Sequence, residues 1–280
     1  MQVDSLAENI FFTTVRIDTV SIDGRAGSGT GFLYAHKIAE DQHAIFVVTN
    51  KHVVSGMRGG ALTFLQKKDD KPNLGHGFRL EINDWPQAWF GHPSPDIDIA
   101  IVPFIPLEAH IKSQAGIDLF YRCVDSSMLP TADQLGALDA IETVTFIGYP
   151  NGVWDSTNLI PVARRGTTAT PIAVDFEGTP RFIIDASVFG GSSGSPVFIL
   201  NNGMYTDKRG GTVIGSRLFF VGVVAAVFFR TELNQIIAVP IPTQTQPMAQ
   251  QREMIDLGLV FKAKTVVETI ETFIQSRSGA

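Results

Sequence analysis

A segment rich in glycine and serine, Gly190–Pro196, separates two β-prone runs, Arg181–Asp185 and Val197–Leu200. Such a cluster is commonly a turn. Glycines on both sides of a serine also allow a sharp bend with free backbone amides, which an oxyanion-binding site requires. Pro196 and the apolar run after it predict a strand rather than a helix. The chain is therefore predicted to turn here between two strands of a β protein.

The same segment fits the G-x-S-x-G nucleophile elbow of α/β-hydrolases, which would make Ser192 the nucleophile. That class needs a histidine after its nucleophile and a helix directly behind it. All the histidines precede the segment: His36, His43, His52, His76, His92 and His110. Together with Pro196, this order excludes an α/β-hydrolase.

His52 lies where a predicted core strand ends. The run Ala44–Thr49 is apolar and β-branched, and Asn50-Lys51-His52 follows it. The end of a core strand can present a side chain in a cleft on a rigid support. The other five histidines lie among polar or turn-forming neighbours and are expected at the surface. On position alone, a strand-end histidine without a special role remains the alternative.

Asp98 lies at the start of another apolar run, Ile99–Val102. A carboxylate beside a buried strand is unfavourable unless a positive or hydrogen-bonding group meets it. The N–H of a histidine would meet it, and the carboxylate would then hold the imidazole in one tautomer. Asp96 is on the same face of the strand and is the alternative partner. A capping or turn role for Asp98 also remains open.

Taken in order, these segments and Gly29–Tyr34 resemble the trypsin/chymotrypsin-like serine peptidases, over about residues 8–276. The closest resemblance is to the bacterial, disulfide-free branch that includes the HtrA-type protease domains, here without a PDZ module. It implies a serine endopeptidase with a catalytic triad of His52, Asp98 and Ser193, the serine of G-x-S-G-x-P. It also implies an oxyanion hole formed by the amides of Gly191 and Ser193, and an acyl-enzyme intermediate.

The resemblance also implies where substrate lies. Protein or peptide substrate is expected to add a β-strand beside Ala225, Ala226 and Val227. Ser187 would form the base of the primary pocket, and Gly258 would lie on its other side. No acidic residue is available there, so we expect small or aliphatic P1 residues. In the animal digestive enzymes of this family, an aspartate directly before the nucleophile binds the newly cut N-terminus and so activates the zymogen. Ser192 occupies that position here, so activity is expected without N-terminal cleavage.

The expected architecture is all-β: two six-stranded antiparallel β-barrels with a C-terminal α-helix, in a single domain over 1–280. The expected parts are an N-terminal barrel at about 8–125, a crossover at about 126–137, a C-terminal barrel at about 138–263 and a helix at about 265–276. Thr265 and Glu268 are predicted to form a capping box for that helix. Residues 231–256 contain three prolines and are expected to form a long partner-binding or lid loop.

Composition excludes several classes of function. The net charge of −6 argues against a nucleic-acid partner. Cys123 is the only cysteine, which excludes an internal disulfide and favours a reducing compartment. No signal peptide is visible, and the longest apolar run, Leu218–Phe229, is too short to cross a membrane. We therefore expect a cytoplasmic protein. The acyl-transfer chemistry that the resemblance implies needs no metal or organic cofactor. A catalytically silent binding scaffold is the alternative to an enzyme.

Overall fold

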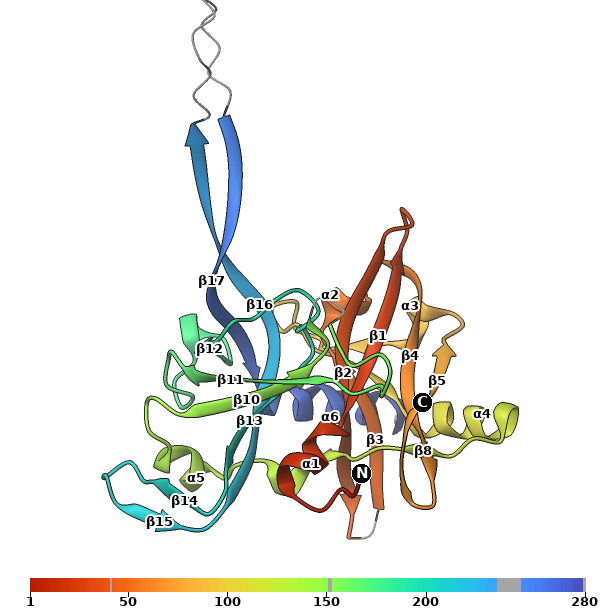
Figure 1. The fold of residues 1–280 in the computed structure, drawn as a ribbon, viewed down its shortest axis with the longest axis horizontal. Coiled ribbons are helices and arrows are strands. Elements are labelled where there is room, and N and C mark those ends of the chain that lie inside the picture. The colour runs from red at the N-terminus through yellow and green to blue at the C-terminus, as the bar shows by residue number, and fades with distance from the viewer. Residues whose placement is uncertain (41, 151–152, 236–247, 279–280) are drawn as a thin grey trace, which may run out of the picture.

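The computed structural model of the chain describes residues 1–40, 42–150, 153–235 and 248–278. Strands dominate these residues, and most of them form two large sheets that lie side by side (Figure 1). The helices are α1 (Leu6–Phe11), α2 (Lys51–Val54), α3 (Trp85–Ala88), α4 (Ile105–Ala115), α5 (Ala132–Ala137) and α6 (Lys264–Ser278), with 3₁₀ turns η1 (Ser126–Met128) and η3 (Phe176–Gly178). Within the described residues, no helix combines the length and the apolar character that crossing a membrane requires.

In the described part of the chain, the first sheet has nine strands in the order β5-β4-β1-β2-β3-β7-β6, with β8 beside β4 and β9 beside β2. Their bounds are Thr14–Ser21 (β1), Ala26–Ala39 (β2), Gln42–Thr49 (β3), Met57–Lys68 (β4), Lys71–Glu81 (β5), Phe90–Gly91 (β6), Ala100–Pro103 (β7), Leu119–Phe120 (β8) and Val124–Asp125 (β9). Six strands were expected in this half. The three additional strands, β6, β8 and β9, have only two residues each, which is too short to show a hydrophobic period.

The second sheet closes into a six-stranded barrel in the order β10-β11-β12-β17-β16-β13. Its strands are Thr143–Gly148 (β10), Val162–Thr168 (β11), Arg181–Asp185 (β12), Pro196–Asn201 (β13), Arg217–Gln235 (β16) and Met248–Lys262 (β17), and a separate hairpin holds Met204–Thr206 (β14) and Thr212–Ile214 (β15). The all-β class and the C-terminal helix are confirmed. The segment between the sheets holds η1 and α5.

The expected loop at 231–256 is wrong for its described residues. Strands β16 and β17 pair from Gly222 and Lys262 out to Gln235 and Met248, so they form a long two-stranded ribbon. The ribbon projects away from the barrel (Figure 1). All three prolines that suggested a loop lie within 236–247, and that part of the expectation falls outside the described residues.

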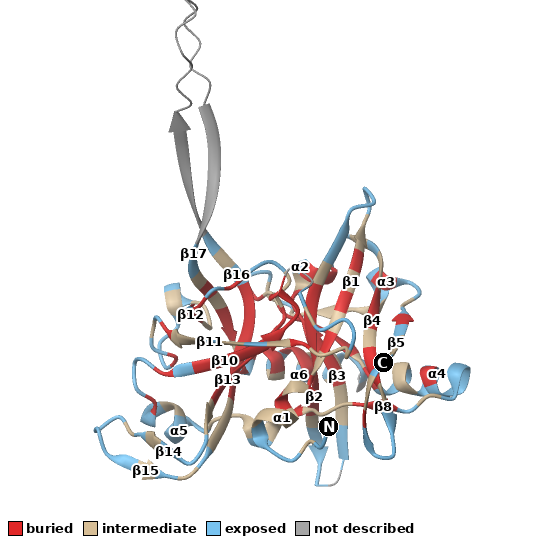
Figure 2. Cartoon of the chain, in the orientation of Figure 1, coloured by how far each residue is buried: buried red, intermediate tan, exposed pale blue. Residues whose placement is uncertain are grey.

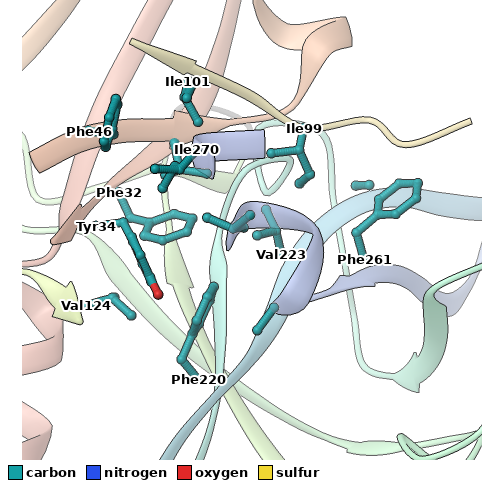
Figure 3. Close-up of a cluster of buried hydrophobic side chains, with 14 of the residues drawn as sticks. Phe32, Tyr34, Phe46, Ile99, Ile101, Val124, Phe220, Val223, Phe261 and Ile270 are labelled. Atoms are coloured by element: carbon teal, nitrogen blue, oxygen red, sulfur yellow. The ribbon is translucent and has the colours of Figure 1, made fainter. Parts of the chain in front are cut away.

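One hydrophobic cluster is shared by the two sheets, and each half has a further cluster of its own. Buried residues are concentrated in the strands of both halves where the two sheets meet (Figure 2). Phe32 of β2 lies against Phe220 of β16, with ring centroids 5.3 Å apart. Tyr34, Phe46 and Phe261 belong to the same cluster (Figure 3). Because aromatic burial dominates core energetics, this shared cluster fixes how the halves meet.

Helix α6 packs against both halves. Val266 and Ile270 are fully buried within the shared core. Phe273 makes an edge-on contact with Phe46 of β3, with centroids 5.7 Å apart, and also contacts Phe90 of β6. The helix expected on the second barrel therefore also covers the first sheet.

Candidate active site

His52 and Asp98 meet because two neighbouring strands bring them together. Strand β3 ends at Thr49, which pairs with Ala100 at the start of β7. The antiparallel pairing places the chain just after β3 beside the chain just before β7. His52 Nδ1 lies 2.5 Å from Asp98 Oδ2, and the His52 backbone N–H donates to Asp98 Oδ1 at 3.0 Å. The structure thus joins the predicted histidine to Asp98.

A buried asparagine contacts the backbone of Asp98. Asn50 is fully buried, and its Nδ2 donates to the Asp98 carbonyl at 2.7 Å. Asp96 is exposed and makes no hydrogen bond with His52 in the part of the chain that the structure describes. The choice between the two aspartates therefore falls on Asp98. Sequence reasoning did not assign Asn50 a role, although a polar residue directly after an apolar strand is a signal for one.

Ser193 lies in the loop between β12 and β13. Its hydroxyl is partly exposed and donates to the carbonyl of Ala225 in β16 at 3.3 Å. Among the described residues no hydrogen bond joins Ser193 to His52. Ser192 is 1% exposed, and its hydroxyl has no hydrogen-bond partner there. Of the two serines, Ser193 is therefore the one whose hydroxyl is accessible.

The backbone around Ser193 leaves two amides free. Gly191 and Gly194 have φ angles of +83° and +88°, a conformation that favours glycine. A Cβ at position 194 would lie 1.8 Å from the Thr30 carbonyl oxygen, so that position accepts only glycine. In the described structure the N–H groups of Gly191 and Ser193 have no acceptor. Both are available to bind a developing negative charge.

Thr30 of β2 ties this loop to the first sheet. It is fully buried, its N–H donates to the Ser193 carbonyl at 2.9 Å, and its hydroxyl donates to the Gly191 carbonyl at 2.9 Å. The same hydroxyl accepts the Tyr149 N–H at 3.0 Å, and Thr49 donates to the Thr30 carbonyl at 2.7 Å. Thr30 therefore positions the loop of one half against the other. The Gly29-Thr30-Gly31 motif pointed to this segment, but not to this role.

Comparison with family models gives one match, the trypsin-like peptidase domain, over residues 29–204. The match covers more than half of the chain and includes His52, Asp98 and Ser193. The chain belongs to the trypsin-like peptidase family.

Solved structures with detectable similarity include three proteases. The Rv3671c protease from M. tuberculosis in its active form is 19% identical, with a TM-score of 0.45, covering 94% of this chain and 81% of that one. HL collagenase is 14% identical, with a TM-score of 0.46 and coverage of 96% and 94%. The HtrA-type protease AlgW with a decapeptide is 14% identical, with a TM-score of 0.48 and coverage of 97% and 67%. No curated protein matches the sequence.

The residues expected to bind substrate in this trypsin-like peptidase lie on two adjacent strands and one loop. Ala225 is buried, Ala226 is exposed, and Val227 pairs with Gly258 of β17. A Cβ on Gly258 would lie 2.6 Å from Val188, the neighbour of Ser187. Ser187 itself is exposed, in the segment after β12. The structure thus gathers these positions beside the loop that carries Ser193.

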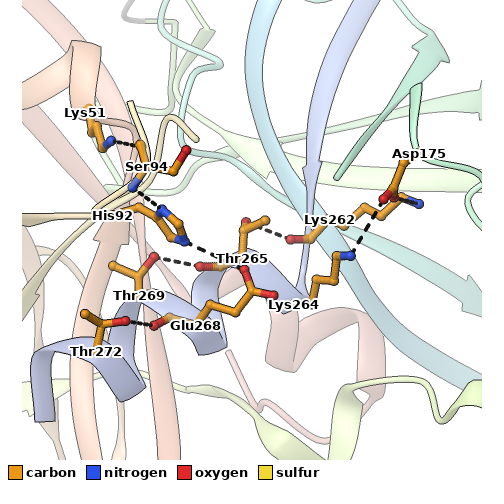
Figure 4. Close-up of polar contacts among 10 residues, drawn as sticks. All are labelled: Lys51, His92, Ser94, Asp175, Lys262, Lys264, Thr265, Glu268, Thr269 and Thr272. Atoms are coloured by element: carbon orange, nitrogen blue, oxygen red, sulfur yellow. Dashed lines mark hydrogen bonds and ion pairs between the residues drawn. The ribbon is translucent and has the colours of Figure 1, made fainter. Parts of the chain in front are cut away.

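A polar chain links α6 of the peptidase to the residue next to His52 (Figure 4). Lys51 Nζ donates to the Ser94 carbonyl at 2.6 Å, and the Ser94 N–H donates to His92 Nδ1 at 3.0 Å. His92 Nε2 lies 3.7 Å from Glu268 of α6. Burial lowers the pKa of His92, and Glu268 opposes that shift. Burial also lowers the pKa of Lys51, against the effect of the Asp98 carboxylate.

This chain of contacts corrects two expectations. The His92 side chain is only 9% exposed, so its surface placement was wrong; its flanking Gly91 and Pro93 suggested a turn but gave no sign that α6 covers it. The capping box is also wrong. Thr265 lies inside α6 and donates to the Lys262 carbonyl at 2.8 Å, while Glu268 faces His92.

We predict that Thr30→Val lowers the free energy of unfolding by about 2–4 kcal/mol, because it leaves the Gly191 carbonyl and the Tyr149 N–H without their buried partner. Urea unfolding measures this change. Thr269→Val is the matched control, since its buried hydroxyl donates only within α6. Thr30→Ser should restore most of the loss. Equal stability of the Thr30→Val and Thr269→Val variants would refute the positioning role.

Proposed function

We propose that this trypsin-like peptidase is a serine endopeptidase that uses Ser193, His52 and Asp98. The proposal is supported by the 2.5 Å contact between His52 and Asp98, together with the two amides of the Ser193 loop that have no acceptor in the described structure. A histidine oriented by a carboxylate and a pair of free N–H donors are the parts that acyl transfer requires. A scaffold without activity would have no need for either arrangement.

In the proposed mechanism, Asp98 keeps the proton of His52 on Nδ1, which leaves Nε2 as the base. His52 takes the proton of Ser193 as its oxygen attacks the peptide carbonyl. The N–H groups of Gly191 and Ser193 bind the oxyanion. His52 then gives its proton to the leaving amine, and water hydrolyses the acyl-enzyme by the same steps.

The hydrogen bond from Ser193 to Ala225 indicates how substrate would prepare the nucleophile. An extended substrate beside β16 places a backbone N–H against the Ala225 carbonyl. The hydroxyl of Ser193 then loses its 3.3 Å acceptor and turns toward His52. Substrate pairing and activation of the serine are therefore coupled in this proposal.

Cys123 is a poor alternative nucleophile. Burial is the main cause that raises the pKa of its thiol, to about 12, so that it stays protonated at neutral pH. It also lies directly before strand β9 of the first sheet, and not in the loop that carries the free amides. These facts favour Ser193 as the acyl acceptor.

We propose small or aliphatic P1 residues, because Val227, Gly258 and Ser187 offer no negative charge. A peptide library with every residue at P1, incubated with the protein and analysed by mass spectrometry, tests this. We expect cleavage after Ala, Val or Leu to exceed cleavage after Lys or Arg by about tenfold or more, because burying the charge of Lys or Arg without a partner is unfavourable. Preferred cleavage after Lys or Arg would contradict the assignment of the pocket.

A further inference from the structure

Strand β16 has one edge that is occupied in the barrel and bare beyond it. Strand β13 pairs with β16 only as far as Val223. The Val224 N–H and carbonyl still bond to the Ser195 carbonyl and the Gly194 N–H. From Ala225 to Gln235, no strand of the described structure pairs with this edge. The opposite edge pairs with β17 along this length, apart from register shifts at Ala225 and Phe228.

This bare edge begins at the proposed nucleophile. The Ala225 carbonyl is the acceptor of the Ser193 hydroxyl, so the first open position of the edge lies in the active site. From there the edge continues outward along the projecting ribbon (Figure 1). Its eleven positions, 225–235, span about 35 Å at the rise of a β-strand. Among the described residues, the outer edge of β17 is also bare beyond Asp256, whose carbonyl accepts the Ala186 N–H, but it lies on the other side of the ribbon from Ser193.

An unpaired strand edge of this length presents a row of backbone donors and acceptors that an extended chain can use. Both strands that pair with β16 are antiparallel to it. Since β16 runs outward from the barrel, an antiparallel polypeptide ending at Ser193 runs inward from the tip of the ribbon. The residues along the ribbon are then those on the amino-terminal side of the scissile bond.

We propose that the edge of β16 from Phe228 to Gln235 is a binding site for extended polypeptide, and that it continues the substrate strand upstream of the primary site. The inference rests on the proposed peptidase function and names its substrate class. Preferred substrates present about ten unfolded residues before the cleaved bond. Backbone pairing accepts most sequences, so the site selects unfolded chains rather than a sequence motif.

The test compares two peptides with the same cleavage sequence, one with four residues before the scissile bond and one with twelve. Several added backbone hydrogen bonds are expected to raise kcat/KM by about tenfold for the longer peptide. N-methylation of the backbone amides six to ten residues upstream removes donors without changing side chains. It is expected to abolish the gain.

A shortened ribbon provides the matched variant. Thr231 and Arg252 are register partners, so replacing residues 232–251 by Asn-Gly joins them through a two-residue hairpin turn. The ratio of the two kcat/KM values is the readout, and it should fall in this variant, which keeps 228–231 of the proposed site and lacks 232–235. A wild type that cleaves both peptides equally, or a shortened variant that keeps the gain, would overturn the inference. Failure of the wild type to cleave either peptide would instead overturn the proposed function.

Discussion

Asp98→Asn is expected to lower kcat/KM for peptide cleavage by about 10⁴-fold while leaving the fold intact. Asp98 accepts two hydrogen bonds, one from the His52 backbone N–H and one from the ring. In the variant, the amide oxygen stays with the backbone N–H, so the NH₂ group faces Nδ1. The imidazole must then carry its proton on Nε2. It can no longer take the proton of Ser193.

Asp96→Asn is the control for this experiment. Asp96 is two residues away and exposed, and it makes no hydrogen bond with His52 within the described residues. Its substitution should change kcat/KM by about twofold or less, as surface changes usually do. Far-UV circular dichroism and thermal unfolding of both variants show whether a low rate comes from loss of the general base or from loss of the folded structure. Comparable rates for the two variants would mean that Asp98 does not orient the imidazole.

Residues of the candidate site could be predicted where residues adjacent in the sequence form an informative pattern. His52 and Asp98 were found because each lies at the end of an apolar run, and strand ends present side chains. The glycines around Ser193 were informative because a bend with free amides needs their φ angles. In these cases a few neighbouring residues determine the geometry, so a sequence pattern predicts it.

The partners of Thr30 and Asn50 could not be predicted from sequence because they lie far along the chain. Thr30 bonds to Gly191 and Ser193, and Asn50 bonds to Asp98. Those contacts depend on how the two sheets dock and on the register between β3 and β7. A threonine between glycines on a strand gives no local sign of such a partner.

The fold was predictable in class and less so in detail. Apolar, β-branched runs predicted individual strands, and the resemblance to the peptidase family implied the all-β class. The composition of the segment 231–256 led to a wrong prediction. The glutamines and prolines near 236–247 suggested a loop for the whole segment, but its described residues form strands. Strand pairing over that length is a cooperative property of two segments, Phe229–Gln235 and Met248–Met254, and neither alone shows an apolar period.

The assignment of Ser193 as the nucleophile is tested most directly by labelling the intact protein with a fluorophosphonate. This reagent reacts with a serine that is activated by a neighbouring base. Mass spectrometry should find one adduct, on Ser193, in the wild type. Ser193→Ala should abolish the adduct and lower kcat for peptide cleavage by about 10⁶-fold. Ser192→Ala is the matched control, because its buried hydroxyl has no partner in the described structure and its loss should be nearly neutral. A wild type that forms no adduct, or an adduct that persists in Ser193→Ala, would contradict the assignment of Ser193 as the nucleophile.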